Sequence, residues 1–203
     1  MKSIAELKFD SIVKHGFHET LKPMGFKKKA SNFYQYKNGI GHIINLQKSY
    51  MSSKNKIHFT INTGVFLPEF WFTVYNYSNK PIPDYPTEAE CILRRRIGQL
   101  RNVNDLWYDI TEDSDESQLI DEMKNNLSEH ILPHFAQVLS KDMLVDFLDR
   151  QTTWLQPLEK LIVYGELGEI EKTKKEFLRL VGETGNPSFL GTVKEYGKKY
   201  GIV

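Results

Sequence analysis

The adjacent pair Asn38-Gly39 constrains the fold more than any other feature of the sequence. Both central residues of a two-residue type I′ hairpin turn need positive φ angles, and asparagine and glycine tolerate them best. Segments rich in aromatic and β-branched residues flank the pair, and a second polar turn, residues 52–55, follows. The stretch from Asn32 to Val65 therefore predicts three antiparallel strands that follow one another as a meander.

The two turns also predict which residues lie opposite one another. With Met51 opposite Lys56 across a four-residue loop, Leu46 lies opposite Ile61. Because opposed residues share a face and successive residues alternate faces, the apolar side chains gather on one face of the sheet. A slip of one residue would mix the two faces. The apolar face is predicted to hold Phe33, His42, Ile44, Leu46, Tyr50, Ile57, Phe59, Ile61 and Val65.

The opposite face gathers amide, hydroxyl, imidazole and phenol side chains. Tyrosine beside short polar groups is typical of adaptable recognition surfaces. Aromatic side chains on a sheet can also stack single-stranded bases. The same residue types occur on the ordinary solvent-facing side of an antiparallel sheet, and this alternative stays open. The predicted polar face consists of Tyr34, Tyr36, Asn45, Gln47, Ser49, His58, Thr60 and Asn62.

We expect helices both before and after the sheet region in the sequence. Ser3 and Glu6 form a capping-box pattern, so we predict a first helix that ends near Lys22-Pro23 and covers one face of the sheet. From about Leu119 the apolar residues recur at helical spacing to the C-terminus, which predicts five helices. Between these regions we expect a solvated lead-in at 27–29, for which phosphate binding by the three lysines is the alternative. We also expect a strand or aromatic loop at 70–77, a strand or short helix at 91–100, and a short strand at 105–110 that Trp107 anchors.

These elements predict an α+β fold in which an antiparallel sheet packs against an N-terminal helix and an α-helical C-terminal region follows. We expect an α+β domain at residues 1–140 and a helical extension at 141–203. The net charge of +1 gives no general attraction to nucleic acid or to an anionic membrane. No window approaches the ~18 apolar residues of a membrane helix, and the N-terminus lacks the apolar core of a signal peptide. We therefore expect a cytoplasmic protein.

Few residues suggest a catalytic or metal-binding site. The sequence has no GxxxxGK[ST], GxSxG or HExxH motif. Its single cysteine, Cys91, is incompatible with an internal disulfide or a multi-cysteine metal site, and we expect a buried structural thiol. His130 and His134 have metal-compatible spacing, but Pro133 distorts that turn, so we expect neither a metal nor a cofactor. We expect His42 to be a hydrogen-bonded core histidine.

Three consecutive arginines, Arg94, Arg95 and Arg96, form the most concentrated positive charge of the central region. Guanidinium groups bind carboxylates and phosphates in a bidentate manner, so Arg95 is a candidate binding residue. On a strand, however, the three side chains would divide between the two faces. Ion pairs with the acidic segment 111–116 are the simpler expectation.

Several segments, taken in order, resemble the bacterial domain-of-unknown-function family numbered 4304. They are LKPMGFKKKASNFYQY, GHIINLQKS, FTINTGV, RRRIGQL and WYDI. The resemblance covers about Phe9 to Leu139 and excludes the closing helices. It implies an α+β domain with an antiparallel sheet, and it carries no established activity or catalytic residue.

The leading functional hypothesis is a non-enzymatic module that binds a protein or peptide partner. It would use the polar face together with the aromatic segment Phe70–Tyr85. The alternative is a small hydrolase or transferase that works through His58, His42 or Arg95. Single-stranded nucleic-acid binding ranks third, because the near-neutral charge makes it unlikely. The proposed binding residues are Tyr34, Tyr36, Asn45, Gln47, His58, Thr60, Asn62 and Arg95.

Overall fold

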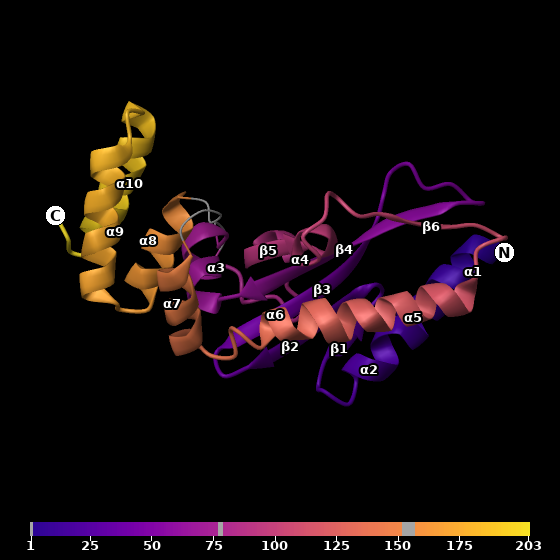
Figure 1. Cartoon of the computed structure of the whole chain (residues 1–203). Coiled ribbons are helices and arrows are strands. Elements are labelled where there is room, and N and C mark those ends of the chain that lie inside the picture. The colour runs from indigo at the N-terminus through magenta and orange to yellow at the C-terminus, as the bar shows by residue number, and fades with distance from the viewer. Residues whose placement is uncertain (1, 77–78, 152–156) are drawn as a thin grey trace.

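The computed structural model describes residues 2–76, 79–151 and 157–203. It is an elongated molecule with an antiparallel sheet in its middle (Figure 1). The N-terminal helix lies near one end and the last two helices lie at the other. The fold is α+β, as the sequence predicts.

The described residues form six strands in one sheet, in the order β1-β2-β3-β4-β5, with β6 beside the other part of β4. The predicted register is confirmed, because Leu46 lies opposite Ile61 and Phe33 opposite Ile44. Residues 27–29, expected as a lead-in, form the first strand. The strands are β1 (Lys27–Lys29), β2 (Asn32–Lys37), β3 (Ile40–Lys48), β4 (Ile57–Phe66), β5 (Ile92–Arg96) and β6 (Tyr108–Ile110).

The turn between β3 and β4 is longer than the sequence predicts. The last opposed pair of the ladder is Lys48 and Phe59, so the predicted pairing of residue 51 with residue 56 is wrong. The Ser52 hydroxyl instead bonds to both the backbone N–H and the carbonyl of His58, at 3.0 and 3.1 Å. This hydroxyl helps to close the loop beyond the last opposed pair, together with the bond from the backbone N–H of Ser49 to the carbonyl of His58. Tyr50, expected on the apolar face, is consequently 97% exposed.

Two long helical segments cover the apolar face of the sheet (Figure 1). The first has the predicted capping box between Ser3 and Glu6 and reaches Leu21, through a π-helical stretch. The second begins at Asp115, whose side chain caps it. Their bounds are α1 (Ile4–Ser11), η1 (Ile12–His18) and α2 (Glu19–Leu21) for the first segment, and α5 (Glu116–Asn126), η3 (Leu127–Ile131) and α6 (Leu132–Phe135) for the second.

A helix, not a strand or loop, follows β4. Helix α3 (Pro68–Val74) begins with proline, whose missing N–H costs nothing in the first helical turn. Phe70 and Trp71 are buried, and Trp71 packs with Cys91, Ile43 and Phe66 over one end of the polar face. The predicted strand or aromatic loop at 70–77 is therefore wrong for residues 70–74; residue 75 forms a turn after the helix, residue 76 has no regular structure, and residue 77 lies outside the described residues. Cys91 is buried, as expected.

The edge of the sheet beside β4 is interrupted. Strand β5 passes directly into α4 (Ile97–Leu100), so the segment 91–100 contains both predicted alternatives. A short 3-10 turn, η2 (Glu88–Glu90), precedes β5, and β6 returns to the same edge at residue 108. The chain between α4 and β6 therefore leaves the sheet and returns to it.

The C-terminal helices pack at the end of the sheet near the last residues of β4 (Figure 1). Leu144 and Ile162 share a buried cluster with Val65 and Ile92. The last two helices form the predicted hairpin, with Phe177 and Val193 buried between them. None of the described helices combines the length and apolar character needed to cross a bilayer. The four helices are α7 (Lys141–Arg150), α8 (Pro157–Glu166), α9 (Ile170–Glu183) and α10 (Pro187–Lys199).

Candidate binding site on the polar sheet face

One polar row crosses the whole sheet. Strands β1 to β5 each contribute one residue to it, because the register places Lys29, Asn32, Asn45, Asn62 and Arg96 side by side. Asn45 donates to Asn32 at 2.6 Å, and Asn62 donates to Asn45 at 3.3 Å. A line of linked amides thus connects two cationic side chains at opposite edges.

The amides at the centre of this row are not freely solvated. Asn62 is only 3% exposed and donates a second hydrogen bond to Gln47 at 2.7 Å. Thr60 is fully buried and donates to the carbonyl of Leu106 at 2.7 Å. The polar face expected from the sequence is therefore partly covered, by α3 at one end and by the segment before β6 at the other.

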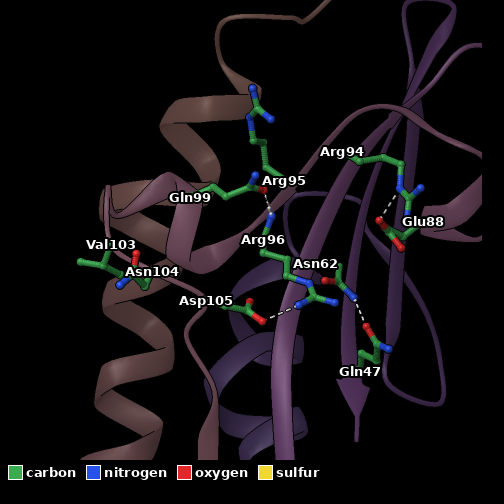
Figure 2. A pocket seen from close by; sticks show the side chains of 10 residues that line it. All are labelled: Gln47, Asn62, Glu88, Arg94, Arg95, Arg96, Gln99, Val103, Asn104 and Asp105. Carbon is green, nitrogen blue, oxygen red and sulfur yellow. Dashed lines mark hydrogen bonds and ion pairs between the residues drawn. The ribbon is translucent and has the colours of Figure 1, made fainter. Parts of the chain in front are cut away.

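Between these covers lies an open cleft with a volume of about 530 Å³. Asn62 and Gln47 form part of its floor, and Arg96 reaches from β5 toward Asp105, which it contacts at 2.7 Å (Figure 2). Arg94 pairs with Glu88 at 2.6 Å. The lining residues are Gln47, Asn62, Glu88, Arg94, Arg95, Arg96, Gln99, Val103, Asn104 and Asp105.

For Arg94 and Arg96 the predicted partners are wrong. Arg94 and Arg96 pair with Glu88 and Asp105, which lie near them in the chain, and not with the acidic segment 111–116. The indole N–H of Trp107 and the guanidinium of Arg96 both donate to Asp105, and they lower the pKa of this carboxyl group. Asp105 is thus a fixed negative charge beside the cleft.

Trp107 packs against the imidazole of His58 and lies near the guanidinium of Arg96. The ring of His58 stacks on it, with centroids 4.7 Å apart and an interplanar angle of 8°. The guanidinium carbon of Arg96 lies 5.5 Å from its centroid. His58 is itself held by Asp109, with Nδ1 and Oδ1 2.6 Å apart. The indole is therefore a partly buried platform beside the cleft, to which its bond to Asp105 connects it.

Arg95 also lines the cleft, but its side chain has a different direction. It lies opposite Thr63 and its side chain points away from Asn62 and Arg96 (Figure 2). The expected division of the three arginines between two faces is thus confirmed. Burial lowers the pKa of Arg95 to about 10, and its charge helps to lower the pKa of His134.

The two tyrosines of the predicted site lie at the other end of the face. Tyr34 is half-buried, and its ring packs edge-to-face with that of Phe66, with the ring centroids 6.5 Å apart. Burial raises the pKa of Tyr34 to about 12. Tyr36, two residues further, is 53% exposed beyond the covered end. Neither lines the cleft. Of the eight predicted binding residues, Gln47, Asn62 and Arg95 line the cleft, and Asn45, Thr60 and His58 share the sheet face of Gln47 and Asn62.

His42 is the core histidine that the sequence predicts. It is buried on the apolar face, where its ring stacks on Phe135 with centroids 4.4 Å apart. Its Nε2 lies 2.7 Å from the carbonyl oxygen of Val138. Burial lowers its pKa, so the neutral ring donates its Nε2 proton to that carbonyl.

Sequence reasoning missed Asp105 as part of the site and treated Trp107 only as a strand anchor. A signal for both was present in the segment DLWYDI, where Asp105, Trp107 and Asp109 are two residues apart. Residues at this spacing lie on one side of an extended chain. The pattern therefore predicts a tryptophan flanked by two carboxylates.

A family model matches residues 17–137, more than half of the 203-residue chain, and its description is a domain of unknown function, DUF4304. The chain belongs to the DUF4304 family. The DUF4304 region includes every strand of the sheet and every residue that lines the cleft, and it ends before α7. No curated protein and no solved structure matches the chain.

Proposed function

We propose that this DUF4304 protein is a non-enzymatic binding module that holds a protein or peptide segment in the cleft of its polar sheet face. The observation that carries the proposal is the row of linked amides beside the Trp107 platform. Primary amides carry the same donor and acceptor groups as a peptide bond, so they can pair with a peptide backbone. An extended segment would rest on the indole and bond to Gln47.

The hydrogen-bond pattern supports this proposal. Gln47 uses its oxygen to accept from Asn62, and among the described residues its NH₂ group has no acceptor. The exposed Gln47 therefore offers donors at the floor of the cleft, while the buried Asn62 holds them in place. Such preorganisation reduces the entropy that binding would otherwise cost.

The chemistry of the cleft favours binding over catalysis. Its described lining contains no serine, cysteine, lysine or histidine, and its titratable carboxylates are paired with arginines. A hydrolase or transferase needs a nucleophile or base in reach of a second working group. The three residues of that alternative lie apart: His58 at the rim, His42 in the core and Arg95 directed away.

We further propose that the protein acts in the bacterial cytoplasm. The single buried thiol fits a reducing compartment. The near-neutral net charge gives no reason to expect a polyanionic partner on this face.

The test uses a library of displayed random peptides, selected on the wild-type protein. Selected peptides are then measured by fluorescence polarisation against the double variant Gln47→Ala, Trp107→Ala. We expect at least a roughly tenfold loss of affinity, because aromatic anchors dominate such interfaces. The control is Lys174→Ala, Lys175→Ala on exposed positions of α9.

Circular dichroism establishes that both double variants remain folded, and Gln47→Ala alone serves if the loss of the indole unfolds the protein. The proposal is wrong if no peptide is selected whose affinity depends on Gln47 or Trp107. It is also wrong if the α9 control weakens binding to the same extent.

A further inference from the structure

A second cavity, with a volume of about 750 Å³, lies at the other side of the sheet. It is bounded by α1 and η1, by the β1–β2 turn and by the end of β3. Its volume lies within the ~300–1,000 Å³ range of small-ligand sites. The lining residues are Lys2, Phe9, Asp10, Val13, Lys14, His18, Lys28, Ala30, Ser31 and Lys48.

The cavity concentrates positive charge in a chain that is nearly neutral. Four lysines and one aspartate line it, which gives a local charge of +3 against +1 for the whole protein. The aspartate, Asp10, is already paired with Lys2. Among the described residues, Lys14, Lys28 and Lys48 have no carboxylate within ion-pair distance. The ammonium of Lys48 lies instead 4.2 Å from the ring centroid of Phe9.

Uncompensated ammonium groups around one cavity repel one another. The three lysines are exposed, so water weakens this repulsion, and a bound anion would reduce it further. They come from η1, β1 and β3, which the fold brings to one hollow.

His18 from η1 also lines the cavity, and the centroid of its ring lies 6.3 Å from that of Phe33. Its Nδ1 has no hydrogen-bond partner among the described residues, but this atom is buried and closed to the cavity. The imidazole therefore forms part of the cavity wall.

We propose that this cavity binds a small ligand that carries two or more phosphate groups. Lysine binds phosphate as a compact point charge, whereas carboxylate ligands favour the bidentate fork of arginine. The described residues that line the cavity include no arginine. Lys14, Lys28 and Lys48 would contact the phosphate oxygens.

This site is independent of the peptide cleft. Lys48 follows Gln47 in β3, and successive strand residues point to opposite faces of a sheet. A ligand in one site therefore does not occupy the other, and either proposal can fail without the other.

The test measures the binding of tripolyphosphate by isothermal titration calorimetry in a phosphate-free buffer of fixed ionic strength. Wild-type protein and the control Lys174→Ala, Lys175→Ala should bind with the same affinity. The variant Lys14→Ala, Lys28→Ala should bind at least roughly tenfold more weakly, because two charged contacts to the anion are lost. A second variant, Lys48→Ala, should also weaken binding, because it removes one further charged contact.

Three results would overturn the proposal. Wild-type protein that does not bind millimolar tripolyphosphate has no such site. Equal affinities of the Lys14→Ala, Lys28→Ala variant and the control would place binding elsewhere. Tighter binding of citrate or of a single-stranded oligothymidylate, lost in the Lys14→Ala, Lys28→Ala variant, would assign the cavity to carboxylates or to nucleic acid.

Discussion

His134 should make the stability of the protein depend on pH in the acidic range. Its side chain is 9% exposed and packs near Phe135 and Phe147. Burial, with added repulsion from Arg95 and His42, lowers its pKa from the ordinary 6.5 to about 4. Between these two values the unfolded chain binds a proton that the folded protein excludes. Stability is therefore complete above pH 6.5 and falls as the pH decreases toward 4.

The magnitude follows from the same two pKa values. One unit of pKa difference corresponds to about 1.4 kcal/mol, so the whole window is worth about 3 kcal/mol, of which about 2.5 kcal/mol is lost by pH 4.5. Carboxylates also lose stabilising interactions in acid. The contribution of His134 must therefore be obtained as a difference between two proteins.

The assay is urea unfolding near pH 7.5 and near pH 4.5 for wild-type protein and His134→Leu. On acidification the wild-type protein should lose about 2.5 kcal/mol more free energy of unfolding than the variant. Ile162→Val, in the neighbouring cluster, is the control and should lower stability by a similar amount at both pH values. Equal acid sensitivity of wild-type protein and His134→Leu would refute the reasoning.

Three further predictions concern the sheet and its edge. Asn62→Leu leaves two amide oxygens without their donor and should lower the free energy of unfolding by about 2–3 kcal/mol in urea titrations; an unchanged midpoint would contradict the linked row. Gly98→Ala places a Cβ against the carbonyl oxygen of Asn104, so it should cost more than ~1 kcal/mol and alter tryptophan fluorescence; a neutral effect would mean that the segment yields. Cys91 is buried and its pKa is raised by burial, so a thiol reagent should react slowly in native protein and rapidly in urea; equal rates would contradict this burial.

The centre of the sheet could be predicted because two local signals agree there. The alternation of apolar and polar residues assigns the faces, and Asn38-Gly39, both with positive φ, fixes the first hairpin. The end of the second hairpin could not be predicted in the same way. Its path depends on the hydroxyl of Ser52, and a serine in a polar turn gives no sign of which backbone groups it will bond.

About half of the candidate site could be predicted for the same reason. Asn45, Gln47 and Asn62 come together because the register alone places them together. The tyrosine end of the face is covered by α3, where burial of Phe70 and Trp71 outweighs the strand preference of aromatic residues. Asp105 reaches the cleft only because the chain leaves the edge after β5 and approaches Gly98 closely.

The amide row also distinguishes registers that the apolar pattern leaves equal. A slip of two residues between β3 and β4 would keep every aliphatic side chain on its own face, so alternation does not oppose it. It would, however, place Asn45 opposite Gly64 or Thr60 in place of Asn62. Directly opposed side chains lie within reach of a hydrogen bond, whereas diagonal ones are about 7–8 Å apart.

Breaking the row costs about 1 kcal/mol for each lost bond and about 1–3 kcal/mol for a buried amide left unpaired. These amounts are a large fraction of the stability of a typical domain. The central asparagines therefore serve the fold whether or not they touch a ligand, and a loss of binding on their substitution would not separate the two roles. Gln47 and Trp107 lie at the margin of the row, and substitutions there test recognition with the register intact.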